Sequence, residues 1–209
     1  STTRTEPDPK PDTPAASHTM SHHPLEIPAE LIAKYNRPGP RYTSYPTAVH
    51  FKEHKEHEEL LDSSRTADGP LSLYFHLPFC ETLCWFCGCN TVITKDKGRV
   101  KDYRALLEKE MNLFARIIQP GRKVRQLHFG GGTPNFFPSD DIRRLGDSIL
   151  SRFPLDDDPE CSVELAPAHL AEDQVRAFAS FGVRRASFGV QDVDSAVQKA
   201  IHRIQPNEM

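Results

Sequence analysis

The chain has 209 residues, of which 37% are hydrophobic and 26% are charged, and its formal net charge is -3. A net charge this close to zero gives no strong positive potential that would favour binding to nucleic acid. No apolar run reaches the roughly 18 residues of a transmembrane helix. The first residues lack an apolar signal segment, so we expect a cytoplasmic protein with one domain, or one domain and a tail.

The N-terminal part of the chain is expected to contribute little to the core. Residues 1–28 are rich in proline and nearly free of large apolar side chains, which predicts a disordered tail. Residues 29–70 are expected to form an arm and helix, with a short amphipathic helix at Ala29–Tyr35. The prolines and aromatic residues at 37–47 are incompatible with a helix and favour an extended arm.

Three histidines follow this arm. A helical pattern is predicted at 53–61, and His50, His54 and His57 would fall on one face of such a helix. Three imidazoles on one face could bind zinc, or the face could simply be solvated. Because no cysteine or carboxylate completes a ligand set, the solvated face is favoured.

From residue 71 onward the sequence alternates between strand-like and helical patterns. Strands are predicted at 71–77, 124–129, 161–165 and 184–190, and helices at 100–118, 139–150, 172–181 and 195–201. The first of these helices is expected to have one apolar stripe, formed by Tyr103, Leu106, Leu107, Met111 and Phe114. This alternation predicts an α/β fold with parallel strands and right-handed crossovers.

The unusual motifs of the chain all follow or end a predicted strand. A cysteine-rich loop follows the first strand, and three consecutive glycines, 130–132, follow the second. Glu164 lies in the third strand and Gln191 follows the fourth. Because sites in such folds gather at the carboxyl ends of the strands, these motifs predict a single site.

Four of the five cysteines, Cys80, Cys84, Cys87 and Cys89, lie within ten residues, and Cys161 stands apart as an expected core residue. Such clustering indicates a reduced metal site and not a disulfide framework. Zinc sites usually use two separated cysteine pairs, whereas one short loop can hold the larger iron–sulfur cluster. An iron–sulfur cluster is therefore favoured, and a zinc knuckle is the alternative.

The segment Cys80-Glu81-Thr82-Leu83-Cys84-Trp85-Phe86-Cys87 resembles the signature of the radical S-adenosylmethionine (SAM) superfamily. The resemblance implies that Cys80, Cys84 and Cys87 hold a [4Fe-4S] cluster whose free iron binds SAM. One electron then cleaves SAM to methionine and a 5′-deoxyadenosyl radical. The segment 130–134, Gly-Gly-Gly-Thr-Pro, is similar to the site for the SAM amino group in that superfamily.

A narrower resemblance rests on five segments, at 39–47, 74–80, 87–90, 128–134 and 189–192. In this order they resemble the oxygen-independent coproporphyrinogen III oxidases (coproporphyrinogen dehydrogenases). Members of that family are about twice as long or more. The resemblance therefore implies that 71–209 form the N-terminal part of a radical SAM (β/α) barrel, truncated after the fourth strand.

The resemblance also implies two SAM molecules side by side. Three residues match positions that contact the cluster-bound SAM: Tyr74, Gly131 and Glu164. Five match positions that contact the second SAM: Phe86, Gly132, Thr133, Gln191 and Arg203. Cys89 matches a cysteine near the site that is not a cluster ligand. Ala166 departs from the family, which more often has Asp there, so a polar group near SAM is missing.

The implied reaction is the oxidative decarboxylation of two propionates of coproporphyrinogen III to vinyl groups, which gives protoporphyrinogen IX for haem synthesis. The substrate is anionic, so Arg37 and Arg41, beside Tyr42 and Tyr45, are expected to contact its carboxylates. The resemblance also implies a monomer that receives electrons from a protein such as flavodoxin and binds neither nucleic acid nor membrane.

A related radical SAM-like haem-binding protein or chaperone, without decarboxylase activity, is the alternative function. That branch is expected to lack both the Gly-Pro-Arg-Tyr-Thr-Ser-Tyr-Pro arm at 39–46 and the extra cysteine. The presence of this arm and of Cys89 favours the oxidase.

Overall fold

The computed structural model describes residues 27–36, 47–51, 53 and 57–205. The chain divides into two compact units, Ser1–Glu53 and His54–Met209. In the first unit, the described residues form helix α1 (Ala29–Tyr35) and the 3-10 turn η1 (Ala48–His50), so the predicted first helix is confirmed. The predicted tail, apart from residues 27 and 28, and the predicted arm at 37–46 lie outside the described residues. The domain boundaries expected after residues 28 and 70 stay predictions.

The three histidines do not share a helix as predicted. His50 ends η1, and His57 begins helix α2 (His57–Thr66), while His54 lies outside the described residues. A common face requires a continuous helix, and Phe51 and Glu53 are not helical. The expectation of one helix face for these histidines is therefore wrong.

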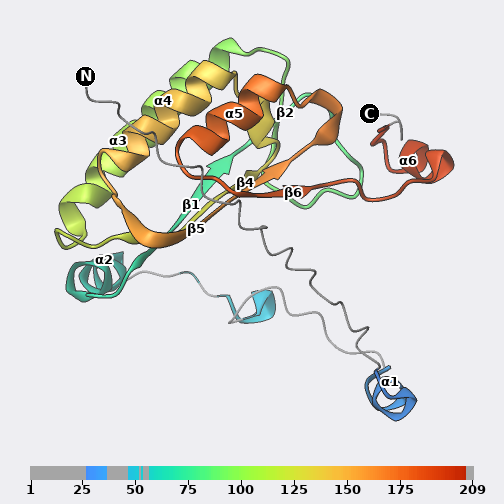
Figure 1. The fold of residues 1–209 in the computed structure, drawn as a ribbon, viewed down its shortest axis with the longest axis horizontal. Helices are drawn as coiled ribbons and strands as arrows, with labels where there is room; N and C mark the ends of the chain where they lie inside the picture. The colour runs from blue at the N-terminus through green and yellow to red at the C-terminus, as the bar shows by residue number, and fades with distance from the viewer. Residues whose placement is uncertain (1–26, 37–46, 52, 54–56, 206–209) are drawn as a thin grey trace, which may run out of the picture. The chain divides into compact units, whose positions relative to one another are not determined.

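The second unit is built on a sheet of four parallel strands, as predicted. The strands are β1 (Leu71–Leu77), β4 (Val124–Gly131), β5 (Leu155–Leu165) and β6 (Arg185–Phe188), and they lie in that order across the sheet. Leu71 pairs with Val124, and Phe129 pairs with Val163. The α/β class and the parallel arrangement are confirmed (Figure 1).

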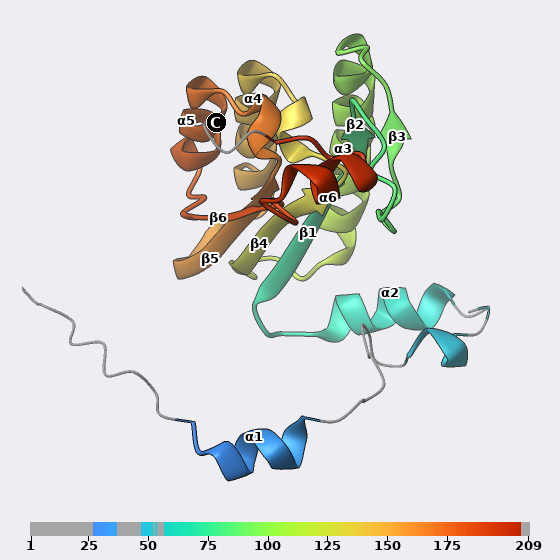
Figure 2. The ribbon, with the colours of Figure 1, turned by 90° about the vertical axis from the view of Figure 1, so that its right-hand side faces the viewer.

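Three helices cover one face of this sheet: α3 (Gly98–Ile117), α4 (Ser139–Leu150) and α5 (Glu172–Ser180) (Figures 1 and 2). Apolar residues alternate along the strands toward these helices, and Leu127, Phe129 and Val163 are almost completely buried. Cys161 is buried in the same core, as expected. In the part of the chain that the structure describes, no helix has the length and apolar character needed to cross a membrane.

The apolar stripe predicted on α3 is buried only in part. Leu107 and Met111 are buried and Val100 joins them, but Leu106 is 57% exposed and Phe114 is 43% exposed. Each residue turns a helix by about 100°, so Leu106 points well away from the direction of Leu107. Leu106 therefore lies at the exposed edge of the stripe, whereas Phe114, seven residues after Leu107, points in nearly the same direction as Leu107 but remains partly exposed.

Two features of the sheet were not expected. Strand β5 begins at Leu155, six residues before the predicted start, although the added segment is mostly acidic. A second, two-stranded parallel sheet joins β2 (Phe79–Cys80) to β3 (Val92–Ile93). The two strands of this small sheet flank the cysteine loop.

The remaining elements are short. The last helix is α6 (Ser195–Ala200), close to the predicted 195–201, and two further 3-10 turns are η2 (Pro134–Phe136) and η3 (Pro167–His169).

Candidate functional site

The cysteine loop is tied directly to the end of the main sheet. The backbone N–H of Gly132 donates to the carbonyl oxygen of Leu77 at 2.9 Å, and the backbone N–H of Thr133 donates to the carbonyl oxygen of Phe79 at 3.0 Å. On the other side, Val92 N–H donates to the carbonyl oxygen of Pro78 at 2.8 Å. The glycine turn after β4 and the start of the cysteine loop are thereby held side by side.

The predicted site residues converge on one cavity at the carboxyl ends of the strands, with a volume of about 310 Å³. Gly131 and Glu164 lie at the ends of β4 and β5, and the other residues follow β1, β4 or β6, as expected where parallel strands end. The lining includes Cys80, Cys84, Phe86, Cys87, Cys89, Gly131, Gly132, Thr133, Glu164, Gln191 and Arg203. Tyr74 is absent from this lining and lines a different cavity.

Two glycines of the triple-glycine turn are required by its geometry. A Cβ atom on Gly132 would lie 2.6 Å from the carbonyl oxygen of Pro78 and 2.9 Å from Cys80 Sγ. Gly131 has φ +115°, a conformation that residues with side chains rarely adopt. The turn therefore allows the cysteine loop to approach the sheet backbone more closely than any larger residue would.

The thiols that line the cavity differ in their surroundings. Cys80 is half-buried, and its Sγ lies 3.3 Å from Thr133 Oγ1. Burial raises the pKa of the Cys80 thiol; the Thr133 hydrogen bond opposes the rise, and the nearby Cys87 and Cys84 add to it. Arg203 Nη1 donates to Cys84 Sγ at 3.4 Å. A thiol with a raised pKa is a poor anion by itself, so its ionisation depends on a positive partner such as a bound metal.

No ordinary single-ion site accompanies these thiols. Among residues 27–36, 47–51, 53 and 57–205, no three His, Cys, Asp or Glu side chains converge closely enough to hold one metal ion. The metal ligands that the cavity offers are soft thiols on one loop, while its walls add a carboxylate and a guanidinium, which cannot bind a metal. This donor set suits an iron–sulfur cluster.

Glu164 belongs to a polar group on the face of the sheet opposite the helices. His128 Nε2 lies 3.6 Å from Glu164 Oε1, and His128 Nδ1 is hydrogen-bonded to Ser162 Oγ at 2.7 Å. Tyr74 stacks on His128, with the ring centroids 5.8 Å apart. Burial, and then the charge of Glu164, raises the pKa of Tyr74. Tyr74 is thus a neighbour of Glu164 although it does not line the thiol cavity.

His128 and Ser162 were not predicted as site residues. The cross-strand register that pairs His128 with Ser162 brings them together. The sequence carried a signal, because polar residues alternate with buried ones along both strands. Their grouping could not be read without the register.

The end of β6 brings Gln191 and Arg203 together. Arg203 Nε donates to the carbonyl oxygen of Gly189 at 2.8 Å, and Gln191 takes a left-handed backbone conformation with φ 70°. A Cβ atom on Gly189 would lie 2.9 Å from Arg203 Nη2 and 3.4 Å from Gln191 Nε2. A glycine at this position therefore lets both side chains pack against the strand end.

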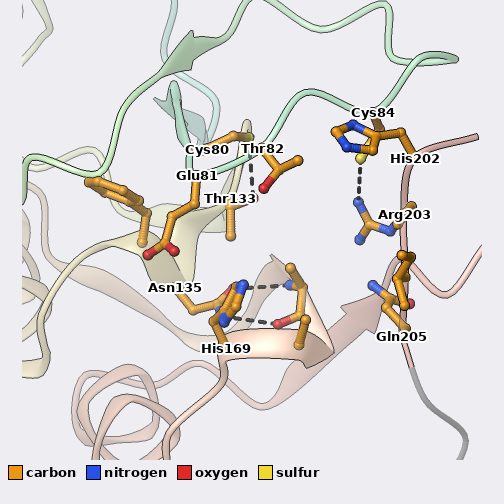
Figure 3. A pocket seen from close by; sticks show the side chains of 14 residues that line it. Cys80, Glu81, Thr82, Cys84, Thr133, Asn135, His169, His202, Arg203 and Gln205 are labelled. Atoms are coloured by element: carbon orange, nitrogen blue, oxygen red, sulfur yellow. Dashed lines mark hydrogen bonds between the residues drawn. The ribbon is translucent and has the colours of Figure 1, made fainter. Parts of the chain in front are cut away.

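A second cavity of about 310 Å³ adjoins the first and shares Cys80, Cys84 and Arg203 with it (Figure 3). Its lining adds residues that the sequence did not single out: Glu81, Asn135, His169 and Gln205. Asn135, which is 2% exposed, donates from Nδ2 to the carbonyl oxygen of Ala166 at 3.0 Å and accepts from Ala166 N–H at 2.9 Å. The side chain of Asn135, which lies in η2 directly after the glycine turn, thus fixes the backbone at Ala166.

Comparisons with known proteins agree with this arrangement. The family model described as the radical SAM superfamily matches residues 74–209. The oxygen-independent coproporphyrinogen III oxidase of Synechocystis is 40% identical over 194 residues, which are 91% of this chain and 42% of that protein. The enzyme of that name from Helicobacter pylori J99 is 44% identical over 189 residues, covering 88% of this chain and 41% of its own length.

A solved structure of coproporphyrinogen III oxidase (HemN) from Escherichia coli, described as a radical SAM enzyme, matches with a TM-score of 0.72 and 37% identity. The match covers 85% of this chain and 39% of that one. The chain therefore spans about two fifths of the length of these relatives, and the resemblance inferred from the motifs is confirmed. Because the family model matches well over half of its residues, the chain belongs to the radical SAM superfamily.

Proposed function

We propose that this chain provides the cluster and SAM sites of an oxygen-independent coproporphyrinogen III oxidase. The observation that carries the proposal is the convergence of Cys80, Cys84 and Cys87 with the triple-glycine turn on one cavity. The curated relatives of that name, and the HemN structure, support the choice among radical SAM reactions. The substrate would be coproporphyrinogen III, whose propionates would become vinyl groups in porphyrin and haem biosynthesis.

In this proposal Cys80, Cys84 and Cys87 bind a [4Fe-4S] cluster. When bound, the cluster supplies the single electron that cleaves SAM. The close approach allowed by Gly132 supports the assignment, because a larger residue there would collide with Pro78 and with Cys80 Sγ and displace a proposed cluster ligand. Cys89 borders the same cavity and is left as a neighbour of the cluster.

The walls of the cavity would bind SAM through complementary charge. Glu164 is a carboxylate that can accept hydrogen bonds from ribose hydroxyls, with His128 beside it to orient it. Arg203 presents a guanidinium, which pairs well with the carboxylate of an amino acid. Tyr74 and Gly131 complete the proposed first SAM site, and Phe86, Gly132, Thr133, Gln191 and Arg203 the proposed second site.

The remaining partners belong to the same proposal. A reductant protein such as flavodoxin would supply electrons to a monomer in the cytoplasm, where a reducing environment keeps clustered thiols free. No nucleic acid or membrane takes part. Arg37 and Arg41, assigned to the propionates of the substrate, lie outside the described residues.

SAM cleavage tests the proposed walls of the cavity. The chain is reconstituted anaerobically with iron and sulfide, reduced with dithionite, and assayed for 5′-deoxyadenosine over a range of SAM concentrations. Losing a hydrogen bond to a charged group costs about 1.5–3 kcal/mol, so Glu164→Gln should raise the half-saturating SAM concentration about 10- to 160-fold. Glu172→Gln, on the exposed face of α5, is the matched control. Equal SAM dependence in Glu164→Gln and wild type would reject the assigned role of Glu164.

The count of SAM molecules is tested separately by equilibrium dialysis of reconstituted protein with labelled SAM. Two SAM per chain are expected for wild type, and one for Arg203→Ala, because Arg203 is assigned to the second molecule. Binding of a single SAM by wild type would remove the second site from the proposal. Mass spectrometry of added coproporphyrinogen III would then distinguish the oxidase from the haem-binding alternative, since only the oxidase releases two CO2.

A further inference from the structure

The cysteine loop between β2 and β3 is poorly fixed by its own backbone. Within residues 81–91, the internal backbone hydrogen bond runs from Cys87 N–H to the carbonyl oxygen of Cys84, at 3.1 Å. Loops with few internal hydrogen bonds depend on contacts from other segments for a defined conformation. The middle of the loop, around Cys84, therefore needs support from elsewhere in the fold.

Three consecutive residues after α6 give that support; we call Ile201, His202 and Arg203 the clasp. The carbonyl oxygen of Ile201 accepts from Trp85 N–H at 3.0 Å, and His202 Nδ1 donates to the carbonyl oxygen of Leu83 at 2.8 Å. These two bonds hold the residues on either side of Cys84. Arg203 then reaches Cys84 Sγ itself (Figure 3).

The imidazole of His202 adds an aromatic contact to the clasp. It stacks on the indole of Trp85 with the ring centroids 5.3 Å apart and an interplanar angle of 24°. His202 has φ 56°, a left-handed conformation at which glycine would be less strained. This conformation ends helix α6, because His202 N–H donates to the carbonyl oxygen of Lys199 at 3.1 Å and Arg203 N–H donates to that of Gln198 at 2.9 Å. The contact of the ring with Trp85, and not the backbone conformation, is what a glycine here could not supply.

We propose that His202 is a positioning residue for the iron–sulfur cluster, acting through Trp85 and Leu83. The clasp holds the loop so that Cys84 faces Arg203 and the cavity. It thereby connects the loop that would bind the cluster to the end of β6, which carries Gln191. The inference rests on the proposed function for its cluster, but the clasp itself can be tested in metal-free protein.

Trp85 is the single tryptophan of the chain, so its fluorescence reports on the clasp alone. The metal-free protein is titrated with acrylamide, in wild type and in His202→Gly, which removes the ring and relieves the backbone strain. Loss of the stack should raise the quenching constant of Trp85 and alter its emission maximum, while far-UV circular dichroism stays unchanged. His202→Phe, which keeps an aromatic ring, should restore protection of Trp85. His169→Gly, from the same cavity wall, is the control and should leave the fluorescence as in wild type.

The second readout is the rate at which a chelator removes iron from reconstituted protein. Loss of an aromatic pair should speed iron release in His202→Gly about 2- to 12-fold. His202→Phe should lie between this variant and wild type, because it keeps the ring but loses the bond to Leu83. Unchanged quenching and unchanged iron release in His202→Gly would overturn the proposal. If wild type takes up no iron, the proposed function fails, and the acrylamide titration still decides whether the clasp exists.

Discussion

The helix-covered face of the sheet and the carboxyl ends of its strands use similar residues in opposite ways. On the helix-covered face, Phe129 is fully buried among the rings of Phe75, Phe178 and Phe181. At the carboxyl ends, Trp85 is 70% exposed and is held by one stack and one backbone hydrogen bond. Packing stabilises the first region, whereas backbone hydrogen bonds and glycines shape the second.

Two glycines, Gly146 in the core and Gly132 at the site, show the same contrast between the two regions. A Cβ atom on Gly146 of α4 would lie 2.2 Å from Phe181 Cδ1, so this glycine lets a helix pack against the core. A Cβ atom on Gly132 would meet the backbone of Pro78 and the sulfur of Cys80. The first glycine serves the core and the second serves the site, so mutations in the two regions should separate stability from cluster binding.

The largest effect is expected in the core. Phe129→Ala should lower the free energy of unfolding by about 3–5 kcal/mol, because a large side chain with no exposed surface leaves a cavity. Urea denaturation measures the change. Leu106→Ala, at a position that is 57% exposed, is the control and should cost less than about 0.5 kcal/mol. If the two variants lost similar stability, the contrast between buried and exposed apolar residues would be refuted.

A smaller loss of stability, with a clear loss of iron, is expected at the glycine turn. Gly132→Ala would force its Cβ against the Pro78 carbonyl and Cys80 Sγ, at a cost of about 1–3 kcal/mol. The cysteine loop would move, so iron uptake on reconstitution should fall. Gly88→Ala lies in the same loop with nothing within 4 Å of the added atom, and should bind iron as wild type does. Full iron content in Gly132→Ala would show that the close approach is not needed.

The smallest effect is expected for the ion pair at the start of the cysteine loop, where Lys97 Nζ lies 2.9 Å from Glu81 Oε1. The hydrogen bond from Lys97 lowers the pKa of Glu81 below its usual 4.5. A lowered pKa in the folded state contributes stability above the unfolded pKa, and this contribution is lost as pH falls through the folded value.

Glu81→Gln should therefore lower the free energy of unfolding at pH 7 by about 0.2–1 kcal/mol, as exposed pairs do. The difference from wild type should disappear when acid protonates Glu81, which urea denaturation at a series of pH values can follow. A difference that grew toward low pH would have the wrong sign for this pair.

Much of the fold could be predicted, because the spacing of apolar residues in the sequence agrees with the side chains that the structure buries. Strand β1 matches its expected bounds, since its alternation places Phe75 and Leu77 in the core. The start of β5 could not be predicted, because the acidic residues 156–158 lack alternation and lie in an irregularity between the Leu155–Val124 and Glu160–Gln126 pairs. The small β2–β3 sheet likewise depends on hydrogen bonds formed after the loop has folded back.

The site also has features that could be predicted from the sequence and features that could not. The meeting of the cysteine loop, the glycine turn, Glu164 and Gln191 was predictable, because parallel strands bring their carboxyl ends together. Asn135 and His202 could not be found in this way. Their partners, Ala166 and Trp85, are set by loop conformations that no periodic pattern describes.

The central proposal is that Cys80, Cys84 and Cys87 would hold an iron–sulfur cluster at the carboxyl ends of these strands. Its most direct test is the iron and sulfide content of anaerobically reconstituted protein. Wild type and Cys161→Ala should hold about four iron atoms per chain and show a brown colour, whereas Cys84→Ser should lose nearly all of its iron. A colourless wild type that holds a single zinc ion, or full iron content in Cys84→Ser, would contradict the claim.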